Sequence, residues 1–225
     1  MKSSKNDRRG TPQGGVVSPL LANLYMNRFL KHWRLTGRGE AFRAHVVAYA
    51  DDFVILSRAR AAEALAWTQA TMTKLGLTLN EAKTSLKDAR KERFDFLGYT
   101  FGPHHRSKDG RPYSGASPSK KSVQRVKTKI GEMLTPQNVE PWPKVRQRLN
   151  SLLLGWSAYF GYGSLAKAYR EVDHYVVDHV RGFLARRHKV KNRGARRFSR
   201  ASIYGGLEVV ALWQHHPSPT PKAAQ

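Results

Sequence analysis

Two adjacent carboxylates between two apolar, β-rich runs constrain this chain most strongly. Residues 46–56 read VVAYADDFVIL, so Asp51 and Asp52 interrupt a stretch of β-branched and aromatic residues. Such runs predict two short strands, and Asp tolerates turn geometry, so we expect a hairpin with the pair at its tip. Two ionised carboxylates are costly to bring together unless a cation compensates them. A bound Mg²⁺ is the favoured explanation, because it prefers oxygen ligands, and a solvated hairpin tip is the alternative.

The net charge of the chain indicates a polyanionic partner. Its 225 residues include 40 Lys plus Arg against 16 Asp plus Glu, which gives a formal charge of +24. Nucleic acid is favoured over a membrane surface, since no apolar run approaches the ~20 residues of a spanning helix. The absence of cysteine excludes disulfides, Cys-based zinc sites and a cysteine nucleophile. Residues 1–10 are polar and basic, unlike a signal peptide, so we expect a cytoplasmic location.

Hydrophobic periodicity predicts an α+β part followed by an all-helical part. Ser18-Pro19 reads as a helix N-cap with proline in the first turn, and strand-like pieces are expected at 77–79 and 94–101. Apolar residues step by three and four along much of the chain from Val123 to Phe183, which is typical of helices. The predicted segments are a polar lead-in (1–17), a mixed domain with the hairpin (18–102), a linker, loop or second hairpin that marks the domain boundary (103–118), a helical domain (119–213) and a disordered tail (214–225).

Four sequence blocks occur in the order and spacing of a reverse transcriptase palm. They are QGGVVSPLLANLYM (13–26), YADD (49–52), GLTLNEAKTS (76–85) and FDFLGYTF (94–101). YADD alone is a weak signal, and the ordered context makes it specific. Further along, LGWSAYF (154–160) is similar to the GWxxYF signature of the thumb, or maturase X domain. From Arg9 to about Trp213 the chain thus resembles a group II intron-encoded reverse transcriptase/maturase.

The resemblance implies a partial reverse transcriptase palm, an antiparallel sheet with helices, followed by an all-α thumb or maturase domain. It implies catalytic and metal-binding roles for Asp51 and Asp52. The nucleotide-binding residues that it implies are Gln13, Gly14, Gly15, Tyr49 and Ala50, and the primer- or template-binding residues are Lys83, Leu97 and Gly98. The residues alone leave open a plain Gly-Gly turn, a solvated lysine and a strand bulge at Gly98.

The densest basic stretch, RRHKVKNRGARRFSR at 186–200, predicts contacts with RNA phosphates. It contains no acidic residue. Its predicted RNA-binding residues are Arg186, Arg187, Lys189, Lys191, Arg193, Arg196, Arg197 and Arg200. A solvated charged face is the alternative. The aromatic residues Trp156, Tyr159 and Phe160 are most simply core residues, and stacking on RNA would require one ring to face outward.

The resemblance implies RNA-templated DNA synthesis with Mg²⁺ and dNTPs in the complete protein, together with intron RNA binding for splicing. The implied partners are group II intron RNA, an RNA/DNA primer–template and dNTP. Relatives carry a fingers region and a first palm strand that ends in another catalytic aspartate, whereas Asp7 in KNDRRG is the sole acid before Gln13. We therefore expect an incomplete Mg²⁺ site and no DNA synthesis by this chain alone, with a missing N-terminal half as a partner in trans. The alternative function is a non-catalytic RNA-binding splicing cofactor.

Overall fold

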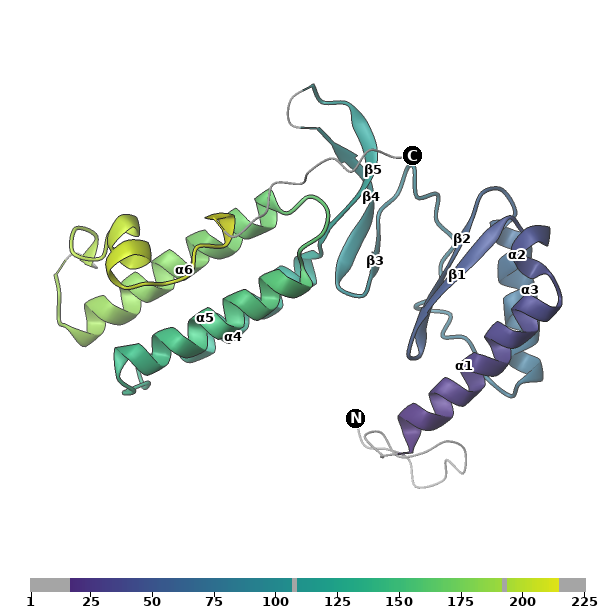
Figure 1. Cartoon of the computed structure of the whole chain (residues 1–225), viewed down its shortest axis with the longest axis horizontal. Coiled ribbons are helices and arrows are strands. Elements are labelled where there is room, and N and C mark those ends of the chain that lie inside the picture. The colour runs from purple at the N-terminus through teal and green to yellow at the C-terminus, as the bar shows by residue number, and fades with distance from the viewer. Residues whose placement is uncertain (1–16, 107–108, 192–193, 215–225) are drawn as a thin grey trace. The chain divides into compact units, whose positions relative to one another are not determined.

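The computed structural model describes residues 17–106, 109–191 and 194–214 of the chain. The chain divides into two compact units, Met1–Leu86 and Lys87–Gln225. Each unit has a hydrophobic core of its own. Small antiparallel sheets and helices share the first part of the chain, and the last part is helical (Figure 1), which confirms the predicted α+β class.

The first unit is a β-hairpin with helices on one face (Figure 1). Its elements are α1 (Ser18–Leu35), α2 (Arg38–Ala41), β1 (Ala44–Tyr49), β2 (Asp52–Ser57) and α3 (Ala61–Lys74). Successive strand residues point to opposite faces, so Val46, Phe53 and Ile55 share the face that packs on the core. That core is centred on the fully buried Phe29 and on Trp33.

Two local predictions in the first unit differ from the structure. Val17 is the N-cap of α1 and Ser18 is its first helical residue, so the predicted cap was wrong by one position. Pro19 lies in the first turn as predicted, because its fixed φ suits that place. The segment Leu77–Leu79 forms no strand, although its leucines pack on the core. A strand needs a neighbour for its backbone groups, and no described strand pairs with this segment.

The second unit begins with a three-stranded antiparallel sheet. Its strands are β3 (Phe94–Phe96), β4 (Tyr99–His105) and β5 (Pro112–Pro118), in the order β3-β4-β5. The block FDFLGYTF is therefore a hairpin with a turn, and not one strand. Residues 103–118, predicted as a linker, loop or hairpin and as the domain boundary, form most of the β4–β5 hairpin, while the chain divides earlier, after Leu86. Pro112 and Pro118 are tolerated because they begin and end the edge strand β5, and Pro103 lies in β4 beyond the residues that pair with β3.

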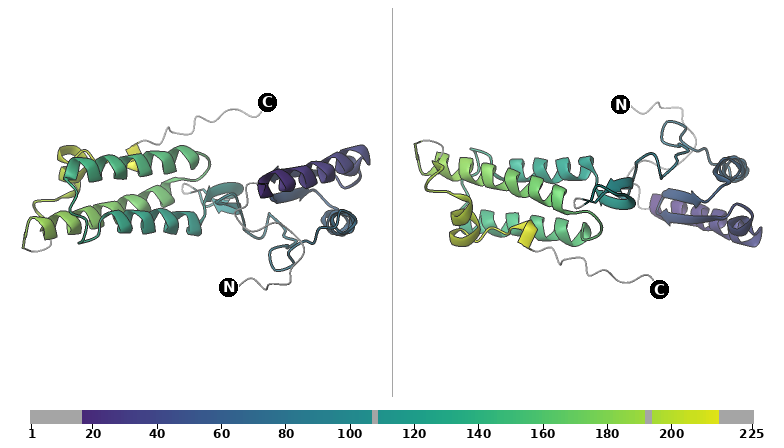
Figure 2. Two further views of the ribbon diagram at one scale, coloured as in Figure 1. Left: turned by 90° about the horizontal axis from the view of Figure 1, so that it is seen from below. Right: turned by 90° about the horizontal axis from the view of Figure 1, so that it is seen from above.

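The rest of the second unit is helical. It contains α4 (Lys120–Met133), α5 (Trp142–Tyr159) and α6 (Ala166–Arg187), followed by the short helical turns η2 (Ser202–Gly206) and η3 (Leu212–Gln214). The three long helices lie side by side in both views of Figure 2 and bury one continuous core. Ser119 caps α4 by accepting the backbone N–H of Ser122 at 3.2 Å. Within the described residues, no helix has the length and apolarity needed to cross a membrane.

A buried carboxylate attaches the C-terminal helical turn to α6. Asp173 is fully buried and accepts the backbone N–H groups of Leu212 and Trp213 at 2.9 and 3.1 Å. The hydroxyl of Tyr204 donates to the Asp173 carbonyl at 3.3 Å. Burial raises the pKa of Tyr204 to about 12, which keeps that hydroxyl a donor. Burial likewise raises the pKa of the Asp173 carboxyl, because the charged form is poorly solvated there.

The raised pKa of Asp173 predicts a specific pH dependence of stability. A carboxyl with a higher pKa in the folded state than in the unfolded state, where it is about 3.9, stabilises the fold when protonated. This stabilisation is present below the unfolded pKa and is lost as the pH rises through the folded pKa. We expect the free energy of unfolding of the wild type, relative to Asp173→Asn, to fall from acidic to neutral pH. Urea denaturation of both proteins along a pH series measures this difference, and a constant or rising difference contradicts the prediction.

Candidate functional site

The paired carboxylates lie at the tip of the β1–β2 hairpin. The pairing of Tyr49 with Asp52 leaves Ala50 and Asp51 as a two-residue turn, as the turn propensity of Asp predicts. Ala50 has a φ of +52°, in the left-handed region. Such backbone conformations cost a residue with a Cβ about 1–3 kcal/mol and are concentrated at functional sites. The strained backbone at Ala50 therefore indicates that the shape of this turn is maintained at an energetic cost.

Both carboxylates face solvent at this tip. Asp51 and Asp52 are exposed, and Tyr49, the cross-strand partner of Asp52, is 66% exposed. Since side chains alternate along a strand, Asp52 lies on the face opposite Phe53 and Ile55. The hairpin thus buries one face under its helices. Its other face is exposed and largely apolar, and the carboxylates lie at the end of that face.

The donor chemistry of this pair fits Mg²⁺, although the number of donors is small. Mg²⁺ is usually held by one or two carboxylates together with waters and substrate phosphates. In residues 17–106, 109–191 and 194–214, no group of three or more His, Cys, Asp or Glu side chains is placed to hold a metal ion. Asp51 and Asp52 therefore offer part of a ligand set, and their metal-binding role stays a prediction.

Of the remaining residues predicted to contact nucleotide or template in the first unit, the structure describes Lys83. Gln13, Gly14 and Gly15 lie outside the described residues, so their role stays a prediction. Lys83 is exposed in a turn in which its backbone N–H donates to the Asn80 carbonyl at 3.0 Å. Its ammonium group forms no ion pair with any described residue, which suits both a phosphate contact and a solvated lysine.

In the second unit, Leu97 and Gly98 form the tight turn between β3 and β4. Phe96 pairs with Tyr99, and the two turn residues have φ values of +48° and +78°. This pattern of two left-handed residues is the hairpin turn that favours glycine at its second position. A Cβ at Gly98 would lie 2.9 Å from the Ser122 hydroxyl oxygen and 3.1 Å from the Phe160 ring. The glycine is therefore explained by turn geometry and packing, and not by a strand bulge.

Helical residues hold this turn from both sides. The Gly98 carbonyl accepts the Ser119 backbone N–H and the Ser122 hydroxyl, each at 2.8 Å. The Tyr159 hydroxyl donates to the Leu97 carbonyl at 3.0 Å, and the Tyr99 hydroxyl donates to the Tyr159 carbonyl at 2.9 Å. Sequence reasoning missed these hydrogen bonds, since they join residues that are 21 to 62 positions apart and leave no local pattern. The only local signal is Ser119 before a helix, which is typical of an N-cap.

The three rings of the LGWSAYF block have different environments. Phe160 is 6% exposed, and the half-buried Trp156 packs against it with ring centroids 5.0 Å apart. The core assignment is confirmed for these two residues. Tyr159 is 59% exposed, so it meets the condition that stacking on RNA requires.

In the basic stretch 186–200, some cations bind groups of the protein itself and others are exposed to solvent. Arg187 donates to the carbonyls of Glu140 and Val139 at 2.5 and 2.9 Å, and Arg186 donates to the Leu134 carbonyl at 3.4 Å. Their guanidinium groups therefore close the α4–α5 connection. Arg197 and Arg200 lie over aromatic rings, each 5.6 Å from the ring centroid. The side chains of Lys189, Lys191 and Arg196 are exposed, while Arg193 lies outside the described residues. RNA binding by this stretch stays a prediction.

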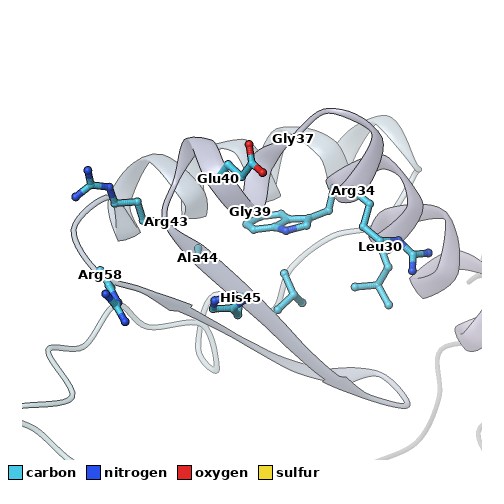
Figure 3. A pocket seen from close by; sticks show the side chains of 11 residues that line it. Leu30, Arg34, Gly37, Gly39, Glu40, Arg43, Ala44, His45 and Arg58 are labelled. Carbon is cyan, nitrogen blue, oxygen red and sulfur yellow. The ribbon is translucent and has the colours of Figure 1, made fainter. Parts of the chain in front are cut away.

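A hollow of about 910 Å³ lies in the first unit among α1, α2 and β1 (Figure 3). Trp33, Leu30 and Val46 contribute its apolar lining. Figure 3 shows Arg43 and Arg58 toward one end and Arg34 toward the other. None of the predicted catalytic or nucleotide-binding residues that the structure describes lines it. The hollow is therefore separate from the carboxylate tip.

Two family models match the chain. The one described as reverse transcriptase (RNA-dependent DNA polymerase) matches residues 2–101, which include the carboxylate hairpin and the Leu97–Gly98 turn. The one described as group II intron, maturase-specific domain matches residues 123–202, which include α5 and α6. No curated protein matches the chain. The two matches follow the order that the sequence blocks predicted.

Proposed function

Because the chain belongs to the group II intron reverse transcriptase/maturase family, we propose that it divides two tasks between its two units. The helical unit binds intron RNA for splicing. The first unit contributes the YADD carboxylates to a site for RNA-templated DNA synthesis from dNTPs. The observation that supports this proposal best is the presence of both family matches on one chain, with the exposed carboxylate tip inside the first match.

In the complete polymerase, Asp51 is the first choice as a Mg²⁺ ligand, and Asp52 is a second ligand or a hydrogen-bond acceptor. When bound there, Mg²⁺ would supply Lewis-acid chemistry that activates the attacking hydroxyl and stabilises the leaving pyrophosphate of a dNTP. The β1–β2 pairing sets the face of the hairpin that Asp52 occupies, and Asp51 lies beside it in the turn. The Leu97–Gly98 turn, held by its serine and tyrosine contacts, offers a rigid support for primer or template.

Among the residues that the structure describes, Asp51 and Asp52 are part of a ligand set for this chemistry, so we propose that a further segment with a carboxylate completes the site. By itself this polypeptide then binds RNA without extending a primer. A purely non-catalytic splicing cofactor is the second candidate. The observation in its favour is that the helical unit buries an extensive core of its own, which supports its folding without the hairpin.

Primer extension and RNA binding on the same preparation test the proposal. With an RNA template, a DNA primer, dNTPs and Mg²⁺, we expect no extension by the 225-residue chain. We expect binding to a group II intron RNA that weakens steeply with salt, by about 10³–10⁵ between about 50 and 200 mM for 6–10 phosphate contacts.

Three outcomes of this experiment decide the proposal. Extension that disappears in Asp51→Ala would show that the polymerase site is already complete. Absent or salt-insensitive RNA binding would contradict the role of the helical unit. If a polypeptide that supplies a further catalytic aspartate restores extension, and Asp51→Ala removes it again, the split-site proposal is supported over the cofactor.

A further inference from the structure

The first helix of the second unit carries three cations in one row. Lys121, Arg125 and Lys129 are each four residues apart on α4, and all three side chains are exposed. Residues four apart on a helix lie one above the other, with Cβ atoms about 5–6 Å apart. The opposite side of α4 is buried through Val123, Val126 and Ile130, so the row is held on a fixed support.

These three cations have no carboxylate partner in the part of the chain that the structure describes. None of the ion pairs there involves Lys121, Arg125 or Lys129. Lys127 on the same helix is different, because its ammonium group lies 2.6 Å from Glu171 and 5.5 Å from the centre of the Tyr175 ring. That lysine joins α4 to α6. The row therefore differs from Lys127, because its three cations form no ion pair with a described residue.

The row also differs from the basic stretch that the sequence emphasises. Arg186 and Arg187 bind backbone carbonyls of the α4–α5 connection, so part of their hydrogen-bonding capacity is used within the fold. Lys121, Arg125 and Lys129 have no such contact with the described residues. A regular row of free cations matches the regular charges of a nucleic-acid strand better than cations that are tied to the protein.

We propose that Lys121, Arg125 and Lys129 form a phosphate-binding row that contacts consecutive backbone phosphates of the bound RNA. This inference rests on the proposed function, since it specifies which surface of the helical unit meets the RNA. The row positions the strand and carries no sequence preference, because phosphates are the same in every sequence. Glu132 lies beyond Lys129 on α4 and is exposed, so the row ends there.

The salt dependence of RNA binding tests the row. The triple variant Lys121→Gln, Arg125→Gln, Lys129→Gln removes three cations and retains residues that favour a helix. Each phosphate contact contributes about 0.7–0.9 to the slope of log affinity against log salt, so we expect the slope to fall by about 2–3. Affinity near 50 mM salt should fall at least about tenfold. The probe is a labelled group II intron RNA, and hydrogen exchange of α4 shows whether the helix stays folded.

A matched control removes the same charge from other positions of the second unit. Arg90, Arg111 and Lys144 are exposed and already lie near Asp88, Asp109 and Glu140, at 3.7, 3.6 and 2.9 Å. Replacing all three by glutamine should leave the slope nearly unchanged. If this control lowers affinity as much as the row variant does, net charge and not the row is responsible, and the inference is overturned.

The remaining outcomes separate this inference from the proposed function. If the wild type binds RNA and the row variant binds equally well, the row is excluded while the proposed function stands. If the wild type itself does not bind, the proposed function fails and the row with it. Should the triple variant lose α4, Arg125→Gln alone serves in its place, with an expected slope change of about 1 and no change as the overturning result.

Discussion

Replacing Phe29 by alanine is expected to unfold the first unit and to leave the second unit folded. Phe29 is fully buried, with ring centroids 5.5 Å from Phe53, 6.1 Å from Trp67 and 6.2 Å from Trp33. Truncating a buried phenylalanine costs about 3–5 kcal/mol, which is a large share of the stability of a small unit. Hydrogen exchange of the full chain should show loss of protection in α1 and α3 and its retention in α4 and α6.

A control on the same helix makes this result specific. Leu24 is 47% exposed, so Leu24→Ala removes a similar apolar side chain with little lost burial. We expect its exchange pattern to match the wild type. Loss of protection in both units of Phe29→Ala would contradict the independence of the two cores, and unchanged protection in both would contradict the assigned role of Phe29.

The same variant also tests whether the helical unit binds intron RNA without the first unit. If intron RNA binding survives in Phe29→Ala, the helical unit suffices for binding and the hairpin is not needed. If binding is lost although α4 to α6 remain protected, the first unit contributes to the RNA contact directly.

Replacing Gly163 by alanine is expected to destabilise the second unit by about 2–4 kcal/mol, since it adds a backbone clash to a strained φ. Gly163 has a φ of +86°, and a Cβ there would overlap the Ala116 carbonyl, with its carbonyl carbon only 2.9 Å away. The clash cannot relax easily, because the next backbone N–H, that of Ser164, donates to the same Ala116 carbonyl at 2.7 Å. Urea denaturation followed by far-UV circular dichroism measures the loss.

Gly155 offers a matched control with an effect of opposite sign. It lies inside α5, and a Cβ there would meet nothing within 4 Å. Because glycine in a helix interior costs about 1 kcal/mol relative to alanine, Gly155→Ala should raise the free energy of unfolding. A loss of stability in Gly155→Ala, or no loss in Gly163→Ala, would contradict the packing described for these two glycines.

Local patterns in the sequence were sufficient for several parts of this protein. The alternation around YADD predicted the β1–β2 hairpin, and apolar spacing predicted α4, α5 and α6. These predictions succeed because hairpin and helix periodicities depend on residues a few positions apart. The ordered blocks likewise predicted the family, as the two family matches confirm.

The sequence predicted strands less accurately where their formation depends on a neighbouring strand. The expected strand at Leu77–Leu79 is absent, since a strand also requires a neighbouring strand. Residues 103–118, for which a linker, a loop or a hairpin was expected, are largely a hairpin, since Pro112 and Pro118 fit the edge strand β5, whose partner strand lies just before it in the chain. Composition alone does not distinguish a loop from an edge strand.

By itself the sequence determined the class of fold, the family, the carboxylate turn and the cationic character of the chain. Only the tertiary structure decided which cations are free, because Arg187 meets carbonyls some 47 positions away while the row on α4 meets no described carboxylate. It also decided why Gly98 and Gly163 must be glycine, through contacts with Ser122, Phe160 and Ala116. The physical reason is that these properties depend on which distant groups come within a few ångströms, and residue spacing along the chain does not encode that distance.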